Sequence, residues 1–162
     1  MLRPRRVAMP VVQTDRIEKQ VLLRAPRSRV WRALTETKEF SQWFGVTLTG
    51  TFAPGARLRG QITHPGYEHL TLELTVDRVE PERLFSWRWH PNAIDPAADY
   101  SAEPTTLVVF ELQEVDGGTL LTVVESGFDR LPAARREQAY SGNDGGWTMQ
   151  MEFIARHVHQ AS

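Results

Sequence analysis

The stretch EHLTLELTVDRVE, residues 68–80, alternates between apolar and polar side chains with a period of two. That period places every second side chain on the same face of a β-strand, so one face packs on the interior while the other meets solvent. The apolar face carries Leu70, Leu72, Leu74 and Val76, and the polar face carries Thr71, Glu73, Thr75 and Asp77. We therefore expect a long strand that is buried on one side.

Strands of the same kind lie on both sides of this stretch. We expect them at residues 16–24, 46–52, 56–64, 84–90, 105–115 and 119–128. Pro-Gly pairs at 54–55 and 65–66 and the Asp-Gly-Gly sequence at 116–118 separate neighbouring strands, and such sequences are typical of tight turns. Residues 91–104, rich in Pro and Ala, form the longest loop. Because the strands need only hairpin connections, we expect an antiparallel sheet.

Two helical segments separate the first strand from the others. Pro26 stands where a helix can begin without losing a needed N–H, and Val30, Trp31 and Leu34 follow at helical spacing. The segment KEFSQWFG, residues 38–45, predicts a second short helix that ends at Gly45, in the position of a C-terminal cap.

The last helical segment is GGWTMQMEFIARHV, residues 145–158. Its apolar positions form one stripe on a helix: Trp147, Met151, Ile154 and Val158. Glycines at 142, 145 and 146 come just before the stripe, and each costs about 0.5–1 kcal/mol in a helix interior. We interpret them either as a helix start that packs closely on the sheet, or as a bend. A bend would leave Trp147 at the mouth of a cavity, as a gate for an apolar ligand.

The order of these elements predicts the fold class. A one-sided antiparallel sheet must bury its apolar face, and the long C-terminal helix is available to cover it. We therefore expect an α+β protein in which a curved antiparallel sheet of about seven strands wraps around the C-terminal helix, with two short helices after the first strand. We assign residues 16–160 to one domain and residues 1–15 to a flexible arm, with Met9 as an alternative start to Met1.

Composition argues against several classes of function. The chain of 162 residues has a formal net charge of −1, so it has no field that would attract nucleic acid. No apolar run approaches the roughly 20 residues that span a bilayer, so we expect no membrane partner. The absence of cysteine excludes disulfides, thiolate metal ligands and cysteine nucleophiles, and it favours a cytoplasmic protein.

The inner faces of these elements supply candidate ligand-binding residues. Side chains that would line a cavity, or simply fill the core, are Trp43, Phe44, Leu72, Leu74, Trp87, Trp89, Phe110, Val123, Trp147 and Met151, with Gly146 beside them. Glu125 shares a face with Leu121 and Val123, which we take as the inner face. A carboxylate there must be paired or take up a proton. The opposite alternation would turn Glu125 outward.

Glu125 is open to two interpretations. It would accept a hydrogen bond from a ligand or act as an acid or base, or it would accept from the indole N–H of Trp87 or Trp89. In the long loop, Asp95, Asp99, Tyr100 and Glu103 either border an entrance or keep the loop solvated.

Patterns for metals and cofactors are weak. His64 and His69 flank a turn with Glu68 beside them, but a stable zinc site needs a third or fourth ligand. The other histidines, at 90, 157 and 159, are not brought there by the sequence, so we expect no metal site. No serine-nucleophile motif and no Gly-rich phosphate loop occurs, so we expect no cofactor.

Four segments together resemble a known family: VLLRAPRSRVWRALTETKEFSQWFG (21–45), LFSWRWHP (84–91), TLLTVVESGF (119–128) and GGWTMQMEFIARHV (145–158). In this order they are similar to bacterial proteins related to the activator of the heat-shock (Hsp) ATPase. These belong to the SRPBCC superfamily, which includes START lipid-binding and birch-pollen-allergen-like domains. The resemblance covers about residues 16–158 and implies the helix-grip fold, with a cavity between the sheet and the C-terminal helix.

Three functions remain open from this resemblance. The first is an intracellular carrier or sensor for a small hydrophobic molecule, monomeric or homodimeric, and we rank it ahead of the others. The second is a polyketide cyclase- or dehydratase-like enzyme that uses Glu125 as acid or base. The third is a module that binds a chaperone or another protein through the outer sheet face. The eukaryotic co-chaperone of this family has a separate N-terminal domain, and with about fifteen residues before the first strand we expect none here.

Overall fold

The computed structural model describes residues 15–95 and 97–160, and its elements follow the predicted order. Within these residues one sheet holds seven strands: β1 (Arg16–Leu23), β2 (Val46–Thr47), β3 (Arg57–Ile62), β4 (Thr71–Glu80), β5 (Leu84–Trp89), β6 (Thr106–Val115) and β7 (Gly118–Ser126). The helices are α1 (Arg27–Thr35), α2 (Thr37–Phe44), the short 3-10 helix η1 (Phe128–Arg130) and α3 (Ala133–Gln160). The predicted arm and both candidate starts lie, apart from Asp15, outside the described residues.

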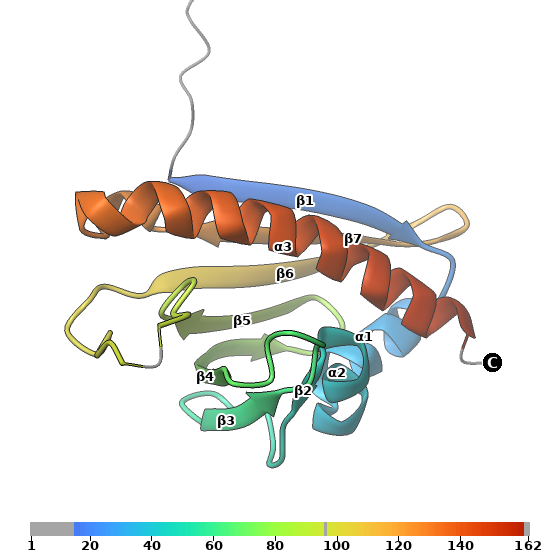
Figure 1. Cartoon of the computed structure of the whole chain (residues 1–162). Helices are drawn as coiled ribbons and strands as arrows, with labels where there is room; N and C mark the ends of the chain where they lie inside the picture. Colours follow the sequence, from blue (N-terminus) through green and yellow to red (C-terminus); the bar gives the residue numbers. More distant parts are fainter. Residues whose placement is uncertain (1–14, 96, 161–162) are drawn as a thin grey trace, which may run out of the picture.

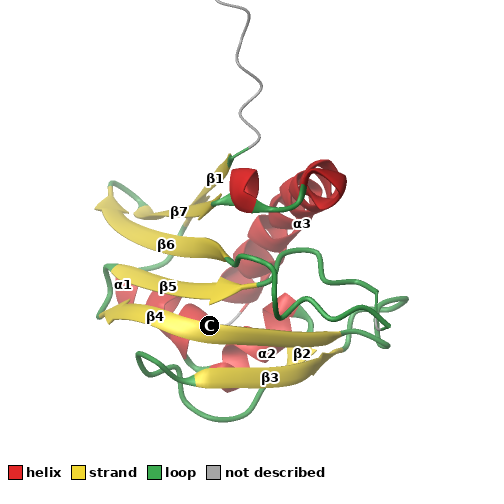
Figure 2. Ribbon diagram, turned by 90° about the vertical axis from the view of Figure 1, so that its left-hand side faces the viewer, coloured by secondary structure: helices red, strands yellow, loops and turns green. Residues whose placement is uncertain are grey.

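The sheet is antiparallel throughout, in the order β1-β7-β6-β5-β4-β3-β2. Consecutive strands from β2 to β7 are neighbours, and β1 closes the edge by pairing with β7. In Figure 1 the sheet curves beneath α3, which runs alongside β1. Figure 2 shows the curved strands with the helices behind them. The predicted α+β helix-grip arrangement is therefore confirmed.

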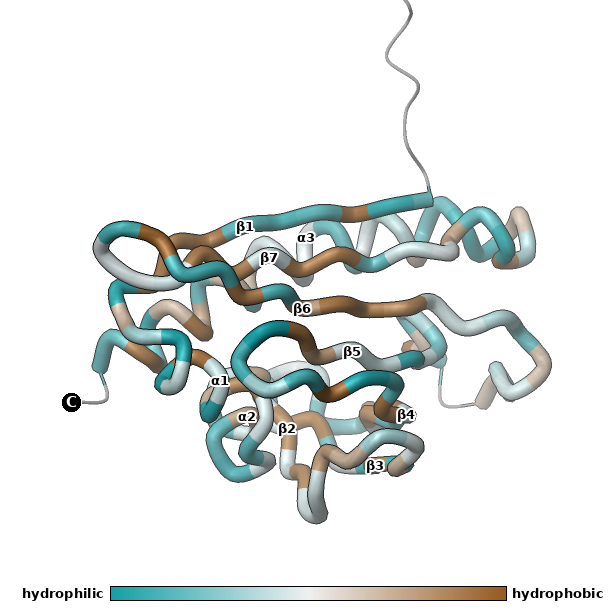
Figure 3. The backbone as a smooth tube through the Cα atoms, turned by 180° about the vertical axis from the view of Figure 1, so that it is seen from behind, coloured by the Kyte–Doolittle hydropathy of each residue, from teal (hydrophilic) through white to brown (hydrophobic). Residues whose placement is uncertain are grey.

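The core lies between the sheet and the helices. Alternate side chains of the strands face inward, and on β7 these include Leu121, Val123 and Glu125. The predicted stripe of α3 is buried at Trp147, Met151, Ile154 and Val158. Figure 3, seen from behind, shows a hydrophobic stretch along part of β6, which lies between β7 and β5.

The second strand is shorter than the predicted range of 46–52. Within that range only Val46 and Thr47 pair with β3. The backbone N–H of Leu48 instead donates to Ser41 Oγ on α2 at 2.9 Å, and Gly50 has a φ of 102°. The chain therefore leaves the sheet after Thr47.

Helix α3 begins at Ala133 and has 28 residues, so Gly142, Gly145 and Gly146 lie in its interior and not at its start. A Cβ added at Gly145 or Gly146 would meet no described atom within 4 Å outside the neighbouring turns of α3. At Gly142 an added Cβ would lie 3.1 Å from Asn92 Oδ1. The interpretation of Gly145 and Gly146 as residues required for close packing is therefore wrong.

Candidate functional site

The carboxylate of Glu125, near the end of β7, is completely buried and accepts hydrogen bonds from four side chains. Its Oε1 accepts from Trp147 Nε1 at 2.8 Å and from Asn143 Nδ2 at 2.9 Å. Its Oε2 accepts from Trp89 Nε1 at 2.8 Å and from Thr106 Oγ1 at 2.6 Å. One carboxylate thus connects β5, β6 and β7 to α3. We call these five residues the Glu125 cluster.

All four donors are neutral, and no lysine, arginine or histidine of the described chain forms an ion pair with Glu125. Burial raises the pKa of Glu125, and the four hydrogen bonds offset this effect only in part. The indoles and the amide N–H can only donate, so they favour the carboxylate form. The hydroxyl of Thr106 can donate or accept, so it can accept a hydrogen bond from Glu125 when that side chain is protonated.

Aromatic rings form the wall beside this carboxylate. The ring centroid of Trp147 lies 5.9 Å from that of Trp89 and 5.7 Å from that of Phe110. It lies 6.3 Å from the centroids of both Trp87 and Phe44. The structure therefore places these predicted residues in one packed cluster, with π-systems in edge and tilted contacts.

The other predicted residues belong to the same core. At most 9% of the residue surface is exposed for Trp43, Phe44, Leu72, Leu74, Trp87, Phe110, Val123, Trp147 and Met151. Trp89 is partly buried and packs against them. Gly146 lies next to Trp147 on α3 but contributes no side chain.

One interpretation of the sequence predicts that Trp147 lies at the mouth of a cavity. The structure contradicts it. The residue surface of Trp147 is 3% exposed, because the indole N–H is held by Glu125 and the ring packs on Phe110. Any gating must therefore come from movement of packed elements, since Trp147 is already enclosed.

Trp87 carries the polar atom that this arrangement leaves unsatisfied. Its side chain is fully buried, and its Nε1 has no hydrogen-bond acceptor among the described residues. Of the two indoles predicted as donors to Glu125, Trp89 makes the bond and Trp87 does not. An unpaired buried donor costs roughly 1–3 kcal/mol, so Trp87 gains this energy when a bound molecule supplies an acceptor.

Sequence reasoning missed Asn143 and Thr106. Asn143 and Trp147 are four residues apart on α3, a spacing that places both on one helix face and could have identified Asn143. Thr106 lies opposite Trp89 in the β5–β6 register. No local pattern encodes that register, because it depends on the length of the loop between the two strands.

The loop of residues 90–105 is bounded at both ends by the Glu125 cluster. It begins directly after Trp89 and ends directly before Thr106, and both of these side chains donate to Glu125 Oε2. Both ends of the long β5–β6 connection therefore lie at the buried carboxylate.

One arginine of α3 fastens this loop. Arg135 Nε donates to the Glu103 carboxylate at 3.0 Å, Nη1 donates to the Asn92 carbonyl at 3.0 Å, and Nη2 donates to the Pro91 carbonyl at 2.9 Å. The guanidinium carbon also lies 4.6 Å from the ring centroid of Tyr100. The sequence did not indicate Arg135, because its partners are backbone carbonyls and one acid far away in the chain.

A pocket of about 610 Å³ lies between the loop and the first turns of α3. The predicted loop residues Asp95, Asp99, Tyr100 and Glu103 line it together with Arg135. They therefore border a surface pocket, and Glu103 also attaches the loop to Arg135.

The histidines are dispersed. His64 lies beside the ring of Phe153, and His157 Nε2 lies 2.9 Å from Oε1 of Glu39. In residues 15–95 and 97–160 no group of three or more His, Asp or Glu side chains is arranged to hold a metal ion. Over the same residues, no helix has both the length and the apolar character needed to cross a membrane.

Comparison with known proteins places the fold in context. The profile of the family described as Activator of Hsp90 ATPase homolog 1-like protein matches residues 24–159. Protein MLL2253 from Mesorhizobium loti has a similar structure, with a TM-score of 0.72, 24% identity, and coverage of 91% of this chain and 98% of that one. A comparison with curated proteins gives no match.

Two further structures are similar. DynU16, from the dynemicin biosynthetic locus, matches with a TM-score of 0.69 and 26% identity over 90% of this chain and 47% of that chain. This chain thus spans about half of DynU16. The Aha1 dimer from Colwellia psychrerythraea matches with a TM-score of 0.66 and 14% identity, over 88% of this chain and 95% of that one.

Proposed function

The chain belongs to the Activator of Hsp90 ATPase homolog 1-like family, within the SRPBCC superfamily, and on this basis we propose that it binds a small apolar molecule. The ligand carries at least one oxygen that forms hydrogen bonds at the Glu125 cluster. The observation that carries this proposal is a fully buried carboxylate with four neutral donors, next to the unpaired N–H of Trp87.

A purely structural role for Glu125 explains fewer features of the site than ligand binding does. The carboxylate does join strands to helix, but a well-packed apolar core achieves the same without burying a charge. The unpaired indole N–H of Trp87 gains nothing from that role. A ligand hydroxyl or carbonyl satisfies Trp87, and the surrounding rings supply the apolar contacts.

Entry to the packed cluster requires local opening, and two features lower its free-energy cost. The loop of residues 90–105 depends on the single side chain of Arg135 for most of its attachment to α3. The α3 segment of residues 141–146, SGNDGG, contains three glycines that weaken the helix without a packing need at 145 and 146. Segments of low local stability open more readily than the rest of a domain.

Glu125 also supports a second candidate function, proton transfer to or from the bound molecule. The favouring observation is the raised pKa of Glu125, which brings the carboxyl group closer to the range where general acids and bases operate. When Glu125 is protonated, Thr106 Oγ1 can accept a hydrogen bond from its carboxyl group. Glu125 therefore has a hydrogen-bond partner in both of its protonation states. The absence of cysteine supports a cytoplasmic setting for either function.

Native mass spectrometry of the purified chain, followed by solvent extraction, tests the binding proposal. We expect a co-purified small molecule at fixed stoichiometry, or uptake of a hydrophobic fluorophore by the empty chain. Glu125→Gln should reduce this binding, whereas Glu137→Gln, the same change at an exposed position of α3, should not. An empty chain that takes up no such probe would contradict the proposal.

A further inference from the structure

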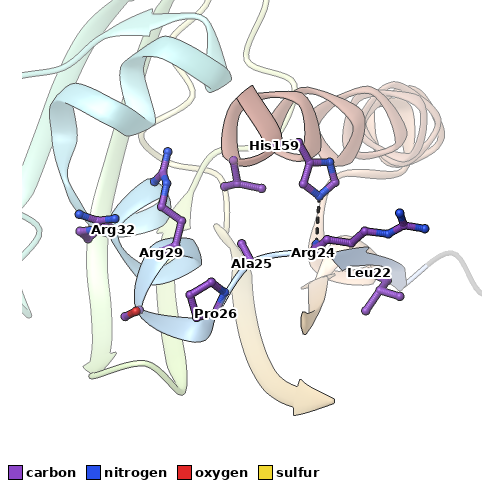
Figure 4. Close-up of a pocket in the computed structure, with 9 residues that line it drawn as sticks. Leu22, Arg24, Ala25, Pro26, Arg29, Arg32 and His159 are labelled. Carbon is purple, nitrogen blue, oxygen red and sulfur yellow. Dashed lines mark hydrogen bonds between the residues drawn. The ribbon is translucent and has the colours of Figure 1, made fainter. Parts of the chain in front are cut away.

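A separate pocket lies near the C-terminal end of α3. It has a volume of about 900 Å³, opens to solvent, and is bordered by the end of β1, by α1 and by the last turn of α3. Figure 4 shows Arg29 and Arg32 of α1 on one side and His159 of α3 on the other, with Ala25 and Pro26 between them. None of the residues that line this pocket donates to Glu125, so it is distinct from the Glu125 cluster.

The lining of this pocket is basic. It includes Arg24, Arg29, Arg32 and His159, and it includes no carboxylate. Arg29 is paired with Glu39 at 2.6 Å, but the guanidinium groups of Arg24 and Arg32 form no hydrogen bond or ion pair with any described residue. The pocket therefore has two positive charges that no acid of the described chain balances.

The remaining donors favour an oxyanion. The Nε2 of His159 accepts the backbone N–H of Arg24 at 3.0 Å, so a neutral His159 carries its hydrogen on Nδ1 and is a donor there. Glu39 is held between Arg29 and His157, so it is not free to neutralise the pocket. In Figure 4 the Arg24 side chain extends outward beside Leu22, and because nothing holds it, turning toward a ligand costs mainly side-chain entropy.

Apolar residues complete the lining. Leu22 is 48% exposed, and Ala25, Pro26 and Val158 lie around the same space. A guanidinium fork binds phosphate oxygens in a bidentate manner, while the apolar side chains contact a hydrocarbon group. We propose that this pocket binds a phosphate monoester carried on a small apolar group. Arg24 and Arg32 lie on opposite sides of the pocket, so the dianion pairs with Arg32 and the Arg24 side chain turns inward to reach it.

Calorimetric titration of the full chain with phenyl phosphate, inorganic phosphate and phenol tests this proposal. Phenyl phosphate should bind about tenfold more tightly than inorganic phosphate because it adds apolar contact, and its affinity should fall as salt screens the charges. Arg32→Gln should weaken phenyl phosphate about tenfold, the loss expected for one charge-assisted hydrogen bond. Arg88→Gln makes the same charge change at an exposed position of β5 and should have no effect.

A shift map of backbone amides in the unmodified chain provides a second readout that does not depend on a variant. Shifts at residues 24–32 and 157–159 support the proposal, and shifts confined to other elements overturn it. Equal affinity in the Arg32→Gln and Arg88→Gln variants also overturns it. The same phosphate chemistry occurs in lipid headgroups, so vesicles containing phosphatidic acid form a further arm. Capture by these vesicles without any response to phenyl phosphate would assign the surface to a membrane and overturn the small-molecule proposal.

Discussion

The indole nitrogen of Trp147, on α3, lies 2.8 Å from Oε1 of Glu125, on β7. Trp89 donates to the other carboxylate oxygen from β5 at the same distance of 2.8 Å. The position of the helix over the sheet therefore depends on a group that can gain or lose a proton.

Replacing Glu125 with Gln should destabilise the protein at neutral pH by about 1–3 kcal/mol, because the new NH₂ group replaces an oxygen that accepts from an indole N–H, and an indole N–H can only donate. Whichever way the amide is turned, one of the two indoles loses its acceptor. Urea unfolding of both forms measures the difference. Glu137→Gln, exposed on α3, is the matched control and should leave the unfolding free energy within experimental error.

The pH dependence of stability should carry a signature of Glu125. Burial raises its pKa above the ordinary value of 4.5, so the unfolded chain releases this proton at lower pH than the folded chain does. The contribution of Glu125 to the stability of the fold is fully present below pH 4.5, and it is lost as pH rises through the pKa of the folded state. Unfolding free energies of the unmodified chain minus those of Glu125→Gln should therefore fall with rising pH.

Glu39 should show the opposite sign. Burial tends to raise its pKa, but hydrogen bonds from His157 and Arg29 outweigh that effect and lower the pKa below 4.5. Its stabilising contribution is present above that value and is lost as pH falls through the pKa of the folded state. The unfolding free energy of the unmodified chain minus that of the Glu39→Gln variant should therefore rise with pH. A difference that falls with pH would contradict this assignment.

Substituting Ala at Gly145 or Gly146 should stabilise the chain by about 0.5–1 kcal/mol each, because both lie inside α3 and an added Cβ meets no described neighbour outside the adjacent turns. Gly142→Ala is the contrasting variant, since its Cβ would lie 3.1 Å from Asn92 Oδ1. If this segment opens during ligand entry, Gly145→Ala should also slow uptake of a hydrophobic fluorophore in stopped-flow experiments. Unchanged uptake would exclude the segment from gating.

Arg135→Ala should release the loop of residues 90–105 from α3. Amide hydrogen exchange in that loop should accelerate. Exchange in β6 and β7 should change little, because these strands are held by backbone hydrogen bonds to each other. Arg135→Lys should not restore protection, since an ammonium group cannot reach Glu103, Asn92 and Pro91 together. Arg156→Ala, at a solvent-exposed position of the same helix, is the control.

The sequence predicts the elements better than their contacts. The alternation of residues 68–80 and the Pro-Gly turns locate β3 and β4 because these signals are local. The sequence alone does not locate the start of α3, because SGNDGG weakens a helix locally. In the fold, buried Ala139 and the hydrogen bond from Tyr140 Oη to the Arg16 carbonyl hold the preceding turns in place.

The Glu125 cluster could be predicted only in part. The inward position of Glu125 and its bond to Trp89 follow from strand alternation. The contributions of Thr106 and Asn143 depend on strand register and on how α3 lies across the sheet, and these are properties of the assembled fold. The unpaired N–H of Trp87 is likewise visible only once every neighbouring acceptor has been placed.

The most direct test of the binding proposal uses the indole N–H resonances of the five tryptophans in a nitrogen–proton correlation spectrum. Trp87 is assigned with Trp87→Phe, and the chain is titrated with 2-naphthol and, separately, with naphthalene. We predict a saturable downfield shift of the Trp87 N–H with 2-naphthol, accompanied by changes at Trp89 and Trp147, and no downfield shift of Trp87 with naphthalene. If the indole N–H resonances of Trp87, Trp89 and Trp147 remain unperturbed by 2-naphthol at saturating concentration, the proposed ligand site at Glu125 is wrong.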